Sequence, residues 1–92
     1  MKFEWKSYSD GAEQGLIKLP CGEFSVDCSF RDGGFRVRVY SFAVYDGGEW
    51  SGEHDVYTML LELPVRYENV TEAKEAGVKA LKELLKKSVE VL

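Results

Sequence analysis

Two alternating segments joined by an Asp-Gly-Gly turn constrain the fold of this 92-residue chain more than any other feature. In EFSVDCSF, one face carries Phe24, Val26, Cys28 and Phe30, and the other face is polar. Such period-two alternation is typical of a half-buried β-strand. The turn RDGG follows directly, and its residues tolerate the positive φ angles of a tight hairpin turn. Because FRVRVYSFAVY then alternates in the same way, the sequence predicts an antiparallel hairpin.

Three further segments between residues 2 and 65 have strand character. KFEWKSY alternates at the start of the chain and is followed by the breaker SDGAEQG. VYTMLLEL forms another strand, which ends before Pro64 because proline cannot donate a ladder hydrogen bond. LIKL is either a short strand of its own or the early part of a longer strand interrupted near Pro20, and the pattern leaves both interpretations open.

The last segment, NVTEAKEAGVKALKELLKKSVEVL, predicts a helix over about 70–91, because it lacks proline and is rich in good helix formers. Asn69 with Glu72 forms a capping-box pattern, although Thr71 is an alternative cap. One stripe has small residues in its first turns and large ones later: Ala73, Ala76, Gly77, Ala80, Leu81, Leu84, Leu85 and Ser88. Gly77 costs about 1 kcal/mol of helix propensity relative to alanine, so we expect its backbone to lie very close to the sheet.

These elements predict an α+β fold, a three- to four-stranded antiparallel meander packed on one C-terminal helix. Hairpin connections need no crossovers, and one helix can cover one face of a small sheet. A chain of 92 residues has the length of one domain, so we expect residues 1–92 to form a single domain. It lacks the run of about 18 apolar residues that a membrane span needs. Its start, MKFEWKSYSD, lacks the apolar stretch of a secretory signal, which predicts a cytoplasmic location.

Charge and cysteine content disfavour several functional classes. The net charge is −4, which is not the usual electrostatic footprint of a nucleic-acid-binding protein. Cys21 and Cys28 are seven positions apart, a spacing that fits neither a C-x-x-C redox motif nor a zinc knuckle. We therefore expect two reduced thiols that act as small apolar fillers, and no cofactor.

The segment DGGEWSGEHD, residues 46–55, contains four carboxylates and the only histidine of the chain. Its carboxylates do not follow the two-residue steps of calcium loops. His54 lies between Glu53 and Asp55, and neighbours on an extended chain point to opposite faces, so they seldom form a catalytic dyad. The common nucleophile and phosphate-binding motifs are also absent from the sequence. We interpret the segment as a connection between two strands and expect neither a metal site nor an enzyme.

Trp50, in the middle of this segment, has two interpretations. It folds back over an edge of the core, or it is an exposed aromatic anchor at a protein interface, where tryptophan is enriched. The carboxylates of Glu49 and Glu53 beside it would favour a basic partner surface.

The second face of the predicted sheet also carries apolar residues, because Tyr40, Phe42 and Val44 alternate with the core residues of their strand. In VYTMLLEL the same face is predicted to hold every second residue: Tyr57, Met59, Leu61 and Leu63. If one helix covers one face, this second face is exposed, and large exposed apolar patches usually mark an interface. The alternative is that FEWKSY and GLIKL cover it.

Arg36, Arg38 and Tyr40 share this second face, and basic residues beside aromatic ones on a sheet are typical of nucleic-acid platforms. The order of strands followed by a helix resembles the DNA-binding domain of plant AP2-type factors and phage integrase arms. Asp27 and Glu62, however, could be cross-strand partners that make this a salt-bridged face. Nucleic-acid binding through these three residues is therefore the alternative function.

The short acidic chain with a meander and a helix resembles small proteins encoded by phages or mobile elements, including anti-CRISPR and other anti-defence inhibitors. This resemblance implies a non-catalytic regulatory protein that binds a host defence or nucleic-acid-processing complex. We predict binding to a partner protein, or to a second copy in a homodimer, through five residues: Trp50, Glu49, Glu53, Tyr40 and Phe42.

Overall fold

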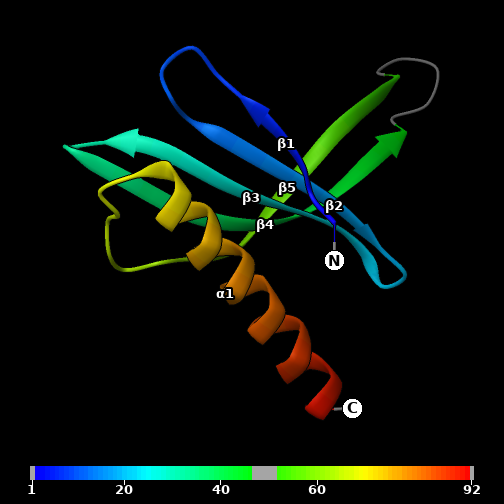
Figure 1. The fold of residues 1–92 in the computed structure, drawn as a ribbon. Coiled ribbons are helices and arrows are strands. Elements are labelled where there is room, and N and C mark those ends of the chain that lie inside the picture. The colour runs from blue at the N-terminus through cyan, green and yellow to red at the C-terminus, as the bar shows by residue number, and fades with distance from the viewer. Residues whose placement is uncertain (1, 47–51, 92) are drawn as a thin grey trace.

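The computed structural model describes the backbone of residues 2–46 and 52–91 and the side chains of residues 2–44 and 55–87. In this part of the chain the elements are β1 (Glu4–Ser7), β2 (Glu13–Leu19), β3 (Gly22–Arg31), β4 (Gly34–Asp46), β5 (Glu53–Glu62) and α1 (Val70–Val91). The strands form one antiparallel sheet in chain order, and α1 lies on one of its faces (Figure 1). The predicted α+β class and helix are confirmed. The sheet has five strands rather than three or four, because both N-terminal segments pair as separate strands.

The predicted tight turn joins β3 to β4. Arg31 pairs with Gly34, and between them Asp32 has a φ of 53° and Gly33 a φ of 81°. Two consecutive positive φ angles are those of a type I′ turn, whose twist matches that of the flanking strands. The turn therefore fixes the register of the central hairpin, in which Val26 lies opposite Val39.

The core lies between α1 and the central strands. Its buried residues come from β2, β3, β4 and α1: Ile17, Val26, Cys28, Val37, Val39, Ala73 and Leu81. A Cβ added at Gly77 would lie 2.3 Å from Cγ1 of Val26 and 3.0 Å from Cγ1 of Val37. The predicted close approach of the helix backbone to the sheet is thus confirmed, and only glycine fits at this crossing.

Asn69 is the N-cap of α1, as the first of the two predicted alternatives had it. Its side-chain Oδ1 accepts a hydrogen bond of 2.9 Å from the backbone amide of Glu72, and its carbonyl accepts one of 3.2 Å from the amide of Ala73. These bonds satisfy the first orphan donors of the helix.

A β-bulge in β5 changes which of its residues face the helix. Val39 pairs with Leu61 but the next residue, Tyr40, pairs with Met59, so Leu60 is the extra residue. A one-residue shift moves every following side chain to the other face. Leu61 and Leu63 consequently pack against the core, and their predicted place on the second face was wrong.

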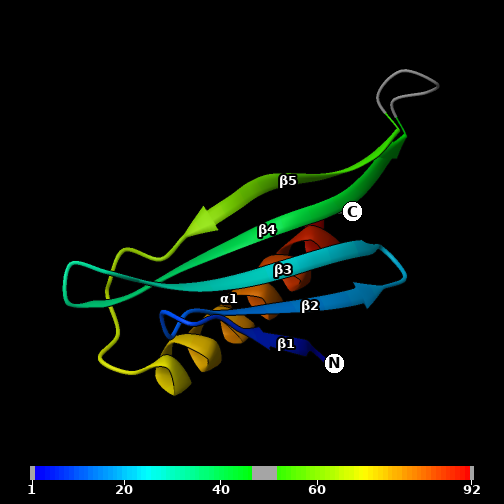
Figure 2. The ribbon, with the colours of Figure 1, turned by 90° about the horizontal axis from the view of Figure 1, so that it is seen from above.

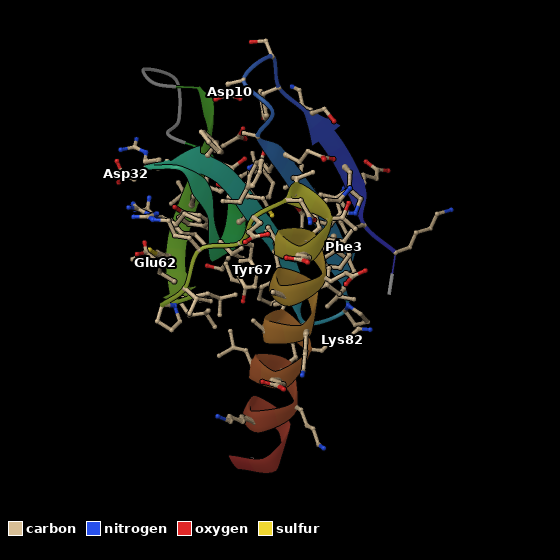
Figure 3. All side chains as sticks on the ribbon, turned by 60° about the vertical axis from the view of Figure 1, so that its left-hand side comes forward. Phe3, Asp10, Asp32, Glu62, Tyr67 and Lys82 are labelled. Atoms are coloured by element: carbon tan, nitrogen blue, oxygen red, sulfur yellow. The ribbon has the colours of Figure 1, made fainter. Side chains whose placement is uncertain are left out.

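The N-terminal segments extend the sheet instead of covering its second face. β2 pairs with β3, and β1 pairs with β2 as the edge strand. The ring of Trp5 covers Gly15, where an added Cβ would lie 2.8 Å from ring atoms. Phe3 packs against the core as well, and Figure 3 shows Phe3 and Tyr67 on opposite flanks of α1. The alternative in which these segments cover the second face is therefore wrong.

The strands β4 and β5 continue past the end of β3 as a two-stranded ribbon (Figure 2). The last pair of β3 with β4 is Glu23 with Phe42, whereas β4 and β5 remain paired as far as Asp46 with Glu53. At this end of the sheet both faces are open, and Val44 and Val56 have exposed fractions of 56% and 40%. Within the described part of the chain, no helix is long and apolar enough to cross a membrane.

The two thiols differ in their surroundings. Cys28 is buried in the core, as predicted, and this burial raises the pKa of its thiol to about 12. Cys21 lies in the two-residue turn between β2 and β3 and is exposed. The prediction that both cysteines fill the core is therefore wrong for Cys21.

Candidate protein-binding face

The outer face of the sheet, opposite α1, carries a cluster of aromatic side chains from β4 and β5. The ring centroid of Tyr57 lies 4.9 Å from that of Phe42 and 6.1 Å from that of Tyr40. These are tilted and edge-to-face arrangements, which aromatic pairs prefer. Tyr40 and Phe42, both predicted as partner-binding residues, are thus joined by Tyr57, which the sequence placed on this face but did not mark as a site residue.

Two exposed aliphatic side chains extend this cluster. Met59 pairs with Tyr40, and its exposed fraction is 54%. Val44 lies two residues after Phe42 on the same face, and its exposed fraction is 56%. We call these five residues the aromatic patch: Tyr40, Phe42, Val44, Tyr57 and Met59. Contiguous exposed apolar surface of this kind usually marks a site of interaction with another molecule.

A polar layer lies beneath the aromatic patch. Ser25 is fully buried although it faces away from α1, and its Oγ donates a hydrogen bond of 3.5 Å to Oδ1 of Asp27. Burial raises the pKa of Asp27, while hydrogen bonds from Gln14 and Ser25 and the charge of Arg38 act in the opposite direction. These groups are satisfied within the protein, so the layer supports the patch and offers no unpaired group to a ligand.

The hydroxyl of Tyr57 interacts with the side chain of Gln14, which belongs to β2. Burial raises the pKa of this hydroxyl, and a hydrogen bond with the side chain of Gln14 acts against this rise. Gln14 also accepts a hydrogen bond of 3.1 Å from the hydroxyl of Tyr8. Sequence reasoning missed this layer, since its members come from strands that are distant in the chain.

Arginines and carboxylates lie together at the end of the outer face where β4 begins. Nε of Arg38 donates a hydrogen bond to Oε2 of Glu62, which lowers the pKa of this carboxyl, and the charges of Arg36 and Arg66 act in the same direction. The predicted cross-strand partner Glu62 is thus confirmed, whereas Asp27 lies opposite Arg38 in register without a direct ion pair. Figure 3 shows Glu62 on the same side as Asp32, which is 3.5 Å from a nitrogen of Arg66. At this end Arg38 is thus paired with Glu62, and Arg66 with Asp32.

Charges of both signs lie at the other end of the outer face, where Lys2, Glu4, Lys18 and Glu23 line a hollow together with Phe42 and Val44. Asp55 is exposed and pairs with Val44, and the last backbone pair of the ribbon joins two acidic residues, Asp46 and Glu53. The predicted residues Glu49 and Trp50, and the side chain of Glu53, lie outside the part of the chain that the structure describes. Among the side chains that it does describe, no three of Asp, Glu, His or Cys come together as a metal site would need.

No family model matches this sequence, and neither curated proteins nor solved structures gave a significant match.

Proposed function

We propose that this protein is a small non-catalytic binding protein and that its outer face is the surface that docks on another protein molecule. The aromatic patch supports this function, because it leaves aromatic and aliphatic side chains exposed on a face that neither α1 nor β1 covers. Buried aromatic anchors supply most of the affinity of protein interfaces. The resemblance to phage-encoded inhibitors makes a host defence or nucleic-acid-processing complex the class of partner that such a regulator controls.

Affinity capture from a bacterial lysate treated with nuclease tests this function with three matched variants. Met59→Lys and Val44→Lys place a charge in the aromatic patch at side chains with exposed fractions of 54% and 56%. Val65→Lys is the control, because Val65 has an exposed fraction of 53% and follows the end of β5, so it is not part of the aromatic patch. Similar exposure means that the three substitutions have similar, small effects on folding.

We expect the wild type and Val65→Lys to retain the same protein, either a host protein or untagged copies of this chain, and the two patch variants to lose it. The proposal is wrong if all variants retain the same proteins in equal amounts. The lysate is treated with nuclease because proteins that are captured only through bound nucleic acid are then no longer recovered.

Nucleic-acid binding is the second candidate, because Arg36, Arg38 and Tyr40 share the outer face as predicted. Its support is weaker, since Arg38 is already bound to Glu62 and Asp27 lies opposite it in register. This function predicts binding to single-stranded or duplex oligonucleotides that weakens steeply as the salt concentration rises. Titration of a labelled oligonucleotide at two salt concentrations measures it, and Arg36→Ala should reduce the salt dependence.

A further inference from the structure

We infer that the partner protein adds a strand to the free edge of β5, and that this strand carries apolar side chains at alternate positions and a lysine or arginine beside Asp55. The inference rests on the proposed function, in which the outer face is a protein interface. It specifies how the partner binds there and what its binding segment contains.

The outer edge of β5 has no neighbouring strand within the described part of the chain. β5 is the last strand of the sheet, so β4 is the strand to which its backbone is paired. Figure 2 shows β5 along one margin of the sheet, with no other described element beyond it. Residues 55–60 are all exposed, although alternate residues of a covered strand are normally buried. The backbone groups on this edge are therefore available to a strand of another molecule.

The two edges of the sheet differ in their protection against strand pairing. Proteins protect edges with short strands and with charged side chains. β1 has only four residues, of which two are charged. β5 has ten residues, and residues 56–61 are uncharged. Its bulge at Leu60 interrupts the regular edge, so an added strand has room beside residues 55–59.

An added strand would lie beside the aromatic patch. Tyr57 and Met59 belong to the patch and are exposed on the outer face, while Val56 and Thr58 are exposed on the other face. Side chains directly opposite each other on neighbouring antiparallel strands lie about 5 Å apart. Apolar side chains of the added strand would therefore be buried against Tyr57 and Met59, and hydrogen bonds between the backbones would hold the strand in register. This combination is the binding mode known as β-strand addition.

Asp55 decides which charge the added strand needs. Its carboxylate is exposed, and none of the ion pairs in the described part of the chain includes it. Lys2 and Lys18 line the hollow beside Val44, which is paired with Asp55, but the carboxylate within reach of Lys18 is that of Glu23, at 3.7 Å. A lysine or arginine level with Asp55 on the added strand would supply the missing counter-charge.

A second copy of β5 does not meet this requirement. Residues 53–63 contain two glutamates and one aspartate but no lysine or arginine. Two β5 strands that pair edge to edge would therefore set acidic side chains against a strand that offers no counter-charge, and like charges across an interface are unfavourable. A strand of a different protein, with a basic residue beside its apolar ones, fits this edge better.

Binding of two matched peptides tests the inference. In KTVTVTK, both lysines and both valines share one face of an extended chain, so a lysine can lie beside Asp55 in either strand direction. ETVTVTE is identical except that glutamate replaces both lysines. A version of KTVTVTK that is N-methylated at its five inner residues keeps the side chains but loses the inner hydrogen-bond donors.

NMR titration measures the dissociation constants, and amide hydrogen exchange locates the bound peptide. We expect KTVTVTK to protect amides of β5, to bind about two- to fivefold more tightly than ETVTVTE, and to lose binding when it is N-methylated. Asp55→Lys should reverse the preference between the two peptides. Glu75→Lys, the same change of charge at an exposed position of α1, should leave it unchanged. Melting temperatures close to that of the wild type would show that both variants are folded.

The inference is overturned if neither peptide protects amides of β5 at about 1 mM, where a complex with a dissociation constant of about 1 mM is half formed. It is also overturned if Asp55→Lys leaves the preference unchanged, or if the free wild type associates with itself and thereby protects β5, because the occupant is then a second copy.

The capture experiment separates these failures from a failure of the proposed function. Capture of a protein that Val44→Lys loses would leave the proposed function standing in each case, because Val44 belongs to β4 and lies away from the edge. Capture of the same proteins in equal amounts by every variant would contradict the proposed function even if KTVTVTK binds to β5.

Discussion

Gly77→Ala is the substitution whose effect on stability follows most directly from the structure. Alanine is the better helix former by about 1 kcal/mol, so helix propensity alone predicts stabilisation. The added Cβ, however, would lie 2.3 Å from Cγ1 of Val26. Because carbon atoms pack at about 3.5–4.0 Å, α1 would have to move by more than about 1 Å from the strands that it covers.

The cost of overpacking a core is about 1–3 kcal/mol, and here it opposes a propensity gain of about 1 kcal/mol. The methyl groups that Gly77 faces belong to β-branched valines in the centre of the sheet, which cannot turn away. We therefore expect the cost to exceed the gain and Gly77→Ala to lower the free energy of unfolding by up to about 2 kcal/mol. For a domain of this size, 1 kcal/mol corresponds to about 4–8 °C in melting temperature.

Urea denaturation followed by circular dichroism measures this effect, and two comparisons separate its parts. The difference between Lys79→Ala and Lys79→Gly, at an exposed position of the same helix, reports helix propensity alone. Val26→Ala removes the nearest methyl groups, so Gly77→Ala should cost less in that background. If Gly77→Ala instead raises the free energy of unfolding by the difference measured between Lys79→Gly and Lys79→Ala, the close approach of helix and sheet is refuted.

Three further predictions concern the turn, a carboxyl group and the thiols. Gly33→Ala should destabilise the protein by about 1–2 kcal/mol in urea denaturation, because its φ of 81° is unfavourable for a residue with a Cβ. Burial raises the pKa of Asp27, so its ionisation costs stability only as the pH rises above the ordinary value of 3.8. The free energy of unfolding of Asp27→Asn minus that of the wild type should therefore grow from about pH 3 to about pH 7, and a flat difference would contradict this cause. A thiol reagent should modify Cys21 in the native protein and Cys28 only after denaturation, because Cys28 is buried with a pKa raised to about 12, and rapid reaction of both would contradict the packing.

Within the candidate site, the sequence indicated the right face but not its construction. Alternation alone placed Tyr40 and Phe42 opposite the core, because period two is a local property of a strand. The contact of Tyr57 with both depends on the register between β4 and β5, and the burial of Ser25 depends on how the strands around it are paired. Such arrangements join distant parts of the chain, and no local pattern records them.

The sequence by itself determined the elements whose geometry is local. The turn at Asp32 and Gly33 and the tight crossing at Gly77 each follow from the conformational limits of single residues. Only the tertiary structure decided that the N-terminal segments extend the sheet as two strands, with β1 at its edge. It also decided that the bulge at Leu60 turns the end of β5 toward the helix. The physical reason is that strand pairing and register are set by partners far away in the chain, whereas alternation shows only that two faces exist.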